Sequence, residues 1–318
     1  MVKTILKHFL IRPVRTWRWP IYEDRFVRFL NSHELADFPA PRHFLKGASD
    51  QYLLWLFSSS STLGYDLNGL IPAMPTDDVQ RNWTGRIGES TLREAFHFFR
   101  ILRRMADKCS KDIGENTQVL DYGCGWGRVI RFFLRDVDHT NLYGCDCYPE
   151  AIEMAKHLNK WCNFEFTRPF PPTDFESNKF DLIYLYSVFS HLSEDLHLKL
   201  LREFHRILSS DGMLVATTRA RDFILHCERI RKQTNVPHQL RGSSESFAEV
   251  EPFLKKYDQG LFCHSPTGGG GTLESSFYGE SCIPRKYVED TWTRWFDIVE
   301  YRYADEKCGQ NVICCRKK

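Results

Sequence analysis

The stretch Val119-Leu120-Asp121-Tyr122-Gly123-Cys124-Gly125-Trp126-Gly127-Arg128 decides the fold. It begins as a short apolar run that ends in an acid, and it continues with three glycines at alternate positions. Glycine lets the backbone turn sharply and lets a ligand approach without a Cβ in the way. A helix predicted over 128–134 would direct its free N–H groups at that ligand. The stretch therefore has the strand, loop and helix order that a ligand-binding glycine loop requires.

Strands and helices are predicted to alternate on both sides of this loop. The apolar runs that predict strands lie at 118–121, 141–145, 162–166, 180–186, 213–217, 296–301 and 311–315. The segments that predict helices lie at 89–106, 149–158, 194–208 and 284–295. Such alternation is typical of an α/β fold, and the last two strands read as a closing pair. The sequence therefore predicts a Rossmann-like, seven-stranded, mostly parallel sheet with helices on both faces.

Two segments stand outside this alternation. Residues 1–85 are predicted to form an N-terminal helical extension or cap, and 86–318 the main domain. Within the main domain, residues 219–275 form a predicted insert after the fifth strand, with several arginines and the run Gly268–Gly271. The first thirty positions carry seven basic residues against two acids. We interpret that excess as a solvated face rather than an anion-binding surface.

A second acid lies at the end of the next predicted strand. Asp146 follows Gly123 by twenty-three residues. A carboxylate at that place can accept hydrogen bonds from both hydroxyls of a ribose. The alternative is that Asp146 caps the helix that begins near Pro149.

The glycine spacing separates two classes of enzyme that share this layout. Nicotinamide-binding sites have G-x-G-x-x-G, whereas this loop reads G-x-G-x-G with Asp121 two residues before the first glycine. A carboxylate would repel a pyrophosphate and suits a cationic ligand that carries an amino acid. The spacing therefore disfavours a nicotinamide-dependent oxidoreductase.

The chain resembles the class I S-adenosylmethionine-dependent methyltransferases in four blocks that occur in the family's order. These blocks are Val119–Gly127, Tyr143–Asp146, Phe180–Tyr184, and Arg206–Leu208 with Asp211–Leu214. The resemblance implies S-adenosylmethionine as the cofactor and methyl transfer as the activity. The acceptor is expected to be a small molecule that is methylated on oxygen or nitrogen. The alternative is a methyltransferase-like binding or scaffold protein without catalysis.

The resemblance also assigns residues to the cofactor. The loop would wrap the methionine part and Asp146 would hold the ribose, with Cys147 near the adenine and Tyr186 as a pocket wall. The expected cofactor-binding set is Asp121, Gly123, Cys124, Gly125, Gly127, Asp146, Cys147 and Tyr186. The segment Trp83–Arg86 is expected to fold over the cofactor. The turn Thr167–Phe170 lacks the acid that the family usually has there.

His191 is the candidate catalytic base. It follows the fourth predicted strand, at the sheet edge where such folds bind ligands, and its side chain titrates near neutral pH. The alternative is that it caps the next helix or lines the pocket without proton transfer. We expect the N-terminal residues 1–80 and the insert to select the acceptor, because function lies in segments grafted on a common fold.

Composition limits the classes of partner, metal site and membrane segment that the chain could have. Hydrophobic residues make up 42 % of the 318 residues, and the formal net charge is +2. That charge and the absence of a nucleic-acid motif disfavour a nucleic-acid partner. The eleven cysteines have no zinc-ligand spacing, so we expect no metal and reduced, buried thiols in a cytoplasmic protein. No run is long enough for a membrane span, and nothing here indicates the oligomeric state.

Overall fold

The computed structural model describes residues 40–59, 69–237 and 240–318. The basic N-terminal stretch therefore lies outside the described residues. Within the described residues, no helix is long and apolar enough to cross a bilayer. In the same part of the chain, no group of three or more His, Cys, Asp or Glu side chains could hold a metal ion.

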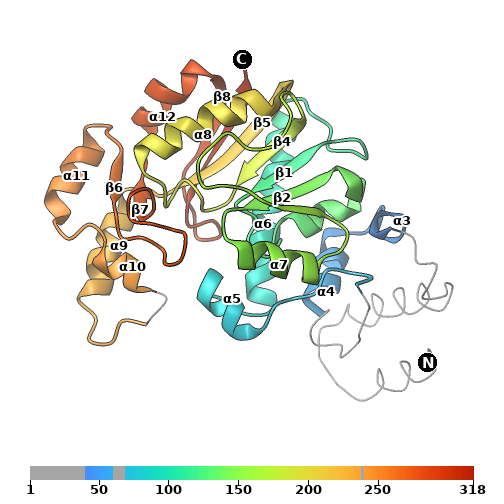
Figure 1. Cartoon of the computed structure of the whole chain (residues 1–318), viewed down its shortest axis with the longest axis horizontal. Helices are drawn as coiled ribbons and strands as arrows, with labels where there is room; N and C mark the ends of the chain where they lie inside the picture. Colours follow the sequence, from blue (N-terminus) through green and yellow to red (C-terminus); the bar gives the residue numbers. More distant parts are fainter. Residues whose placement is uncertain (1–39, 60–68, 238–239) are drawn as a thin grey trace.

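A seven-stranded sheet forms the centre of the molecule (Figure 1). Its strands are β1 (Val119–Tyr122), β2 (Leu142–Asp146), β3 (Asn163–Phe166), β4 (Phe180–Leu185), β5 (Leu208–Thr218), β8 (Phe296–Arg302) and β9 (Asn311–Lys317). They lie in the order β3-β2-β1-β4-β5-β9-β8. The first five are parallel, and β9 runs antiparallel to both β5 and β8. The predicted Rossmann-like, mostly parallel α/β sheet is confirmed.

Helices cover both faces of this sheet. One face packs against α6 (Glu89–Lys108) and α7 (Pro149–Leu158), and the other against α8 (Glu194–Ile207) and α12 (Arg285–Thr291). Alternate residues of β1 enter the two cores: Val119 joins the first and Leu120 the second. Val119 and Leu120 are both fully buried because a central parallel strand is covered by helices on both faces of the sheet.

The segments outside the sheet are built as follows. The N-terminal extension contains α3 (Pro41–Leu45), α4 (Asp50–Ser59) and α5 (Asp77–Thr84). Between β5 and α12 lie α9 (Asp222–Arg231), α10 (Arg241–Glu245), α11 (Val250–Asp258) and the antiparallel pair β6 (Cys263–Ser265) and β7 (Glu280–Cys282). These inserted elements have a small core of their own, and they group to one side of the sheet in Figure 1.

The helix predicted over 128–134 was wrong in type. The chain forms a 3₁₀ helix at Ile130–Arg135 after a series of turns. Arg131 is fully buried there, and its guanidinium donates to the carbonyls of Gly127, Pro72 and Ala73. These bonds to loop and N-terminal carbonyls favour the tighter local geometry over a regular α-helix. Two shorter 3₁₀ helices lie at His139–Asn141 and Trp292–Arg294.

Candidate active site

The glycine loop crosses the carboxyl end of β2. The N–H groups of Gly123 and Cys124 both donate to the Cys145 carbonyl, at 2.8 and 3.0 Å. Gly125 has a φ of +53°, a region that favours glycine. A Cβ on Gly125 would lie 3.5 Å from the Trp83 ring. The loop thus turns tightly under an aromatic cover.

Asp146 holds the loop and the start of α7 together. One carboxylate oxygen accepts from the Gly125 N–H and the other from the Tyr148 N–H, both at 3.0 Å. The N-cap residue of α7 is Tyr148, so Asp146 does not cap that helix. Burial raises the pKa of Asp146, against the opposing effect of these hydrogen bonds. Each oxygen keeps a further lone pair for a ligand hydroxyl.

Three segments distant in sequence meet beside Asp146. Trp83 from α5 and Tyr148 have ring centroids 5.9 Å apart. The hydroxyl of Thr272, from the insert, donates to the Cys147 carbonyl at 3.4 Å. Cys147 is half-buried, and burial raises its pKa to about 12. Both the N-terminal extension and the insert therefore reach the edge where Cys147 was expected to approach the adenine.

Asp121 lies behind the loop rather than in an open space. Only 3 % of its surface is exposed. Burial raises its pKa to about 7; the Tyr184 hydroxyl opposes this rise and the Asp146 charge adds to it. The structure gives Asp121 little surface to offer a ligand. Cys124 is similarly buried, at 6 % exposed.

Tyr186 follows the end of β4 on the other side of the loop. Its ring packs on Phe98 with centroids 4.7 Å apart. The Arg128 guanidinium lies 5.2 Å from the Tyr186 ring centroid and pairs with Glu94 at 2.6 Å. Tyr186 is only partly buried, so part of its side chain is free to line a ligand pocket.

Just after Tyr186 the backbone adopts an unusual conformation. Ser187 has a φ of +63°, which is uncommon for a residue with a side chain. Its N–H donates to Thr217 Oγ1 at 2.7 Å, and its hydroxyl receives a hydrogen bond from Gln310 at 2.9 Å. Such strained residues are held by their surroundings and cluster at functional sites.

His191 lies in a largely buried position beside the insert. Its Nδ1 is 2.9 Å from the Gly279 carbonyl oxygen and 3.4 Å from a Glu280 carboxylate oxygen. The ring stacks on Tyr278, with centroids 5.1 Å apart and planes at 2°. Burial, assisted by the Arg219 charge, lowers the pKa of His191 to about 3. The imidazole is therefore neutral at physiological pH.

Tyr278 links His191 to the Asp146 side of the site. Burial raises the pKa of Tyr278 to about 12; Arg219 opposes that rise, and Asp146 and Cys147 add to it. The phenol is thus within electrostatic reach of both. Sequence reasoning did not single out Tyr278, Glu280 or Arg219 as site residues. The segment has no motif, and its position depends on hydrogen bonds to residues 190–192, which follow β4 and are distant in sequence.

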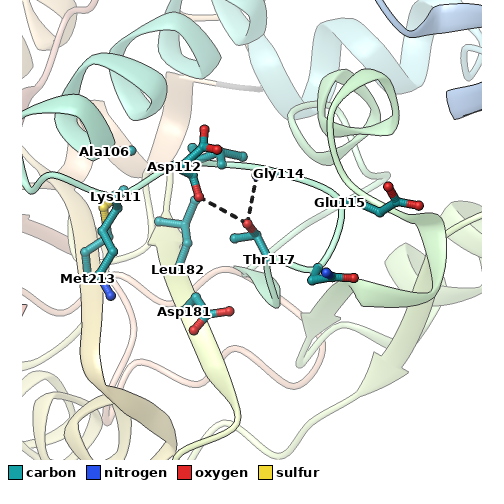
Figure 2. Close-up of a pocket in the computed structure, with 11 residues that line it drawn as sticks. Ala106, Lys111, Asp112, Gly114, Glu115, Thr117, Asp181, Leu182 and Met213 are labelled. Atoms are coloured by element: carbon teal, nitrogen blue, oxygen red, sulfur yellow. Dashed lines mark hydrogen bonds between the residues drawn. The ribbon is translucent and has the colours of Figure 1, made fainter.

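A separate pocket of about 450 Å³ lies at the opposite edge of the sheet. It is lined by the loop after α6 together with Asp181, Leu182 and Met213. In that loop Thr117 Oγ1 accepts from the Gly114 N–H and donates to the Asp112 carbonyl, as Figure 2 shows. Because it adjoins the amino ends of β1 and β4, this pocket is not part of the site around Asp146 and His191.

Comparison with known proteins identifies the kind of domain that contains the glycine loop, Asp146 and His191. Residues 119–212 match the family model described as a methyltransferase domain. No curated protein sequence matches the chain significantly.

Three similar solved structures are methyltransferases by their names. One is an S-adenosylmethionine-dependent methyltransferase from Mesorhizobium loti, at 14 % identity and a TM-score of 0.46, covering 69 % of this chain and 96 % of that one. One from Methanosarcina mazei is 18 % identical with a TM-score of 0.42, covering 64 % and 93 %. The third is the 1,6-didemethyltoxoflavin-N1-methyltransferase of Burkholderia thailandensis, with bound 1,6-didemethyltoxoflavin and S-adenosylhomocysteine. It is 17 % identical with a TM-score of 0.45, covering 76 % and 86 %.

The family match begins at the first residue of β1 and includes the glycine loop, Asp146 and His191. The sheet that carries these residues has the predicted mostly parallel order. Residues 119–212 therefore form a methyltransferase domain.

Proposed function

We propose that this methyltransferase acts on a small molecule, at an oxygen or nitrogen atom placed beside His191. The observation that carries the proposal is that Tyr278 stacks on His191, while Thr272 of the same insert donates to the Cys147 carbonyl beside Asp146. The expected cofactor end and the expected acceptor end of the site are thereby adjacent. Both lie at the carboxyl edge of the parallel strands, where ligands bind in open α/β sheets.

The residues of this edge fit S-adenosylmethionine. Gly125 offers backbone without a Cβ at its closest approach to Trp83. Asp146 has carboxylate lone pairs beyond those used by Gly125 and Tyr148. Trp83 and Tyr148 supply apolar surface on either side, with Trp83 38 % exposed. We assign Asp146 to the ribose hydroxyls and the loop Gly123–Gly127 to the methionine part.

When bound, S-adenosylmethionine would supply a methyl carbon made electrophilic by its sulfonium. The methyl group would pass to the acceptor's lone pair, the electron pair of the broken carbon–sulfur bond would stay on sulfur, and the acceptor's proton would leave to solvent. His191 accepts a hydrogen bond at Nε2 from the acceptor's O–H or N–H group and so orients that lone pair. Such alignment can lower the barrier by several kcal/mol. Because burial lowers its pKa to about 3, His191 is a weak base. We therefore assign it to orienting the acceptor rather than to accepting the acceptor's proton.

The charges around the site favour a neutral acceptor. Arg219 is paired with Glu280, and Arg221 with Asp258 at 2.7 Å. The Arg231 guanidinium donates to the Ser246 and Phe247 carbonyls. These three arginines of the insert are therefore already engaged with partners within it.

A transfer assay tests this function. The purified chain would be incubated with S-adenosylmethionine labelled in its methyl group and a panel of phenols, catechols, carboxylic acids and amines. The proposal predicts label transfer to at least one neutral oxygen or nitrogen acceptor, reduced at least tenfold by His191→Gln. Calorimetry with S-adenosylhomocysteine would run in parallel. Binding without transfer to any member would instead favour the scaffold alternative.

A further inference from the structure

Two oxygens that can only accept lie near the same ring nitrogen of His191, and of the two the Gly279 carbonyl is hydrogen-bonded to it. The Gly279 carbonyl oxygen lies 2.9 Å from Nδ1, and Glu280 Oε2 lies 3.4 Å from it. A neutral imidazole has one N–H and one bare nitrogen. Since a carbonyl and a carboxylate can only accept, Nδ1 must carry the hydrogen. Nε2 is then the bare nitrogen.

The insert segment that supplies these two groups is fixed to residues 190–192, in the loop after β4. The Gly279 N–H donates to the His191 carbonyl at 2.8 Å, and the Ser281 N–H to the Ser190 carbonyl at 2.7 Å. The Ser281 hydroxyl donates to the Leu192 carbonyl, also at 2.7 Å. These bonds join two segments almost ninety residues apart. The carbonyl and the carboxylate are thus held in place before any ligand binds.

Glu280 is a buried carboxylate with identified partners. It is 6 % exposed, pairs with Arg219, and accepts from the Ser243 hydroxyl at 3.2 Å. The Arg219 guanidinium lies 3.7 Å from the Phe223 ring centroid. Further titratable groups near this cluster are His264, which hydrogen-bonds Ser281, and Cys227 and Cys282, which act on Arg219. Arg219 and Glu280 thus form a buried pair of opposite charges beside His191.

We propose that Glu280 is a positioning residue for His191: together with the Gly279 carbonyl it fixes the Nδ1–H form of the ring, so that Nε2 is presented to the methyl acceptor. The flat stack of Tyr278 on the imidazole sets the remaining orientation. This inference rests on the proposed function of His191, and it makes the insert a structural part of the active site. A carboxylate that orients a histidine acts by fixing which nitrogen carries the hydrogen.

The tautomer of His191 can be measured without knowing the acceptor. In protein with ¹⁵N-labelled histidine, the His191 signals would be assigned by their loss in His191→Gln. We expect a protonated Nδ1 and a bare Nε2 in the native chain. In Glu280→Gln the new amide can donate to Nδ1, so we expect the Nε2–H form to reach at least a third of the population. A native chain with hydrogen on Nε2, or a Gln variant with an unchanged tautomer, would overturn the proposal.

Matched variants separate positioning from folding. Glu280→Asp keeps an acceptor and should keep the Nδ1–H form, as should Ser243→Ala, which removes one partner of the carboxylate and leaves Arg219 in place. If Glu280→Gln fails to fold because Arg219 loses its counter-charge, the double variant Arg219→Met/Glu280→Gln removes both charges together. S-adenosylhomocysteine affinity should stay within threefold in all of them. Failure of the native chain to bind S-adenosylhomocysteine would reject the proposed function, whereas an unchanged tautomer with intact binding would reject only this inference.

Discussion

The Trp83 ring lies over the backbone of Gly125, 3.5 Å from where a Cβ on that glycine would stand. It comes from the N-terminal extension, and it also faces Tyr148 across a centroid distance of 5.9 Å. A flat indole over a bare backbone is suited to cover a flat, apolar-edged ligand. Trp83 is 38 % exposed, so a ligand beneath it would bury it further.

Trp83→Ala should weaken S-adenosylhomocysteine binding about tenfold, because loss of an aromatic contact costs roughly 1 kcal/mol or more. Calorimetric titration measures this directly. Trp295→Ala is the matched control, since that indole packs near Arg202 on the α8 side. Equal affinities for the native chain and the Trp83 variant would show that the extension does not cover the cofactor.

Asp146→Ala should reduce S-adenosylhomocysteine affinity about ten- to a hundredfold, because a lost charged hydrogen-bond acceptor costs roughly 1.5–3 kcal/mol. The control is Asp138→Ala at the other end of β2. Asp138 also accepts a backbone hydrogen bond, from Thr140 at 2.9 Å, but it lies away from the carboxyl edge. If both variants bind equally well in calorimetry, the ribose assignment is wrong.

Gly125→Val should abolish cofactor binding. The positive φ of +53° strains any residue with a side chain, and the added atoms would fill the space under Trp83. Gly309→Val is the control, because a Cβ there meets nothing within 4 Å and its φ is not positive. Retained affinity in a folded Gly125 variant, checked by circular dichroism, would mean that the loop does not contact the ligand.

The local sequence was sufficient for the elements that carry the cofactor side. Helix α7 forms over Pro149–Leu158, as predicted, because proline is favoured in the first helical turn and the apolar spacing continues to Leu158. Strand β2 was placed within one residue, and the position of Asp146 at its end followed. In such segments, local pattern and tertiary structure agree.

The part of the site beside His191, which we assign to the methyl acceptor, could not be predicted from local sequence patterns. Strand β7 is three residues long, too short for a periodic pattern. Its place beside His191 is fixed by hydrogen bonds to residues 190–192, which no local signal reveals. The turns and 3₁₀ helix after the glycine loop depend similarly on Arg131 and its carbonyl partners. Here distant contacts determine the local structure.

His197 should make the protein less stable as the pH falls below about 6.5. It is fully buried, and its Nε2 accepts from the Trp292 indole N–H at 2.9 Å. Burial lowers its pKa from 6.5 to about 3. Between those values the unfolded chain binds one proton that the folded chain does not, so stability rises with pH in that window, by up to about 1.4 kcal/mol per pH unit.

His197→Gln should remove this slope, because a glutamine oxygen can still accept from Trp292 but does not titrate. Urea unfolding at pH 5, 6 and 8 would measure the free energy of unfolding of both chains, and the difference between them cancels the other titrating groups. His157→Gln, an exposed side chain on α7, controls for the loss of a histidine, since exposed substitutions usually have little effect. At pH 5 the native chain should lose about 2 kcal/mol more than the His197 variant relative to pH 8. Parallel curves for the two chains would mean that His197 keeps an ordinary pKa in the folded state, and that its surroundings admit water.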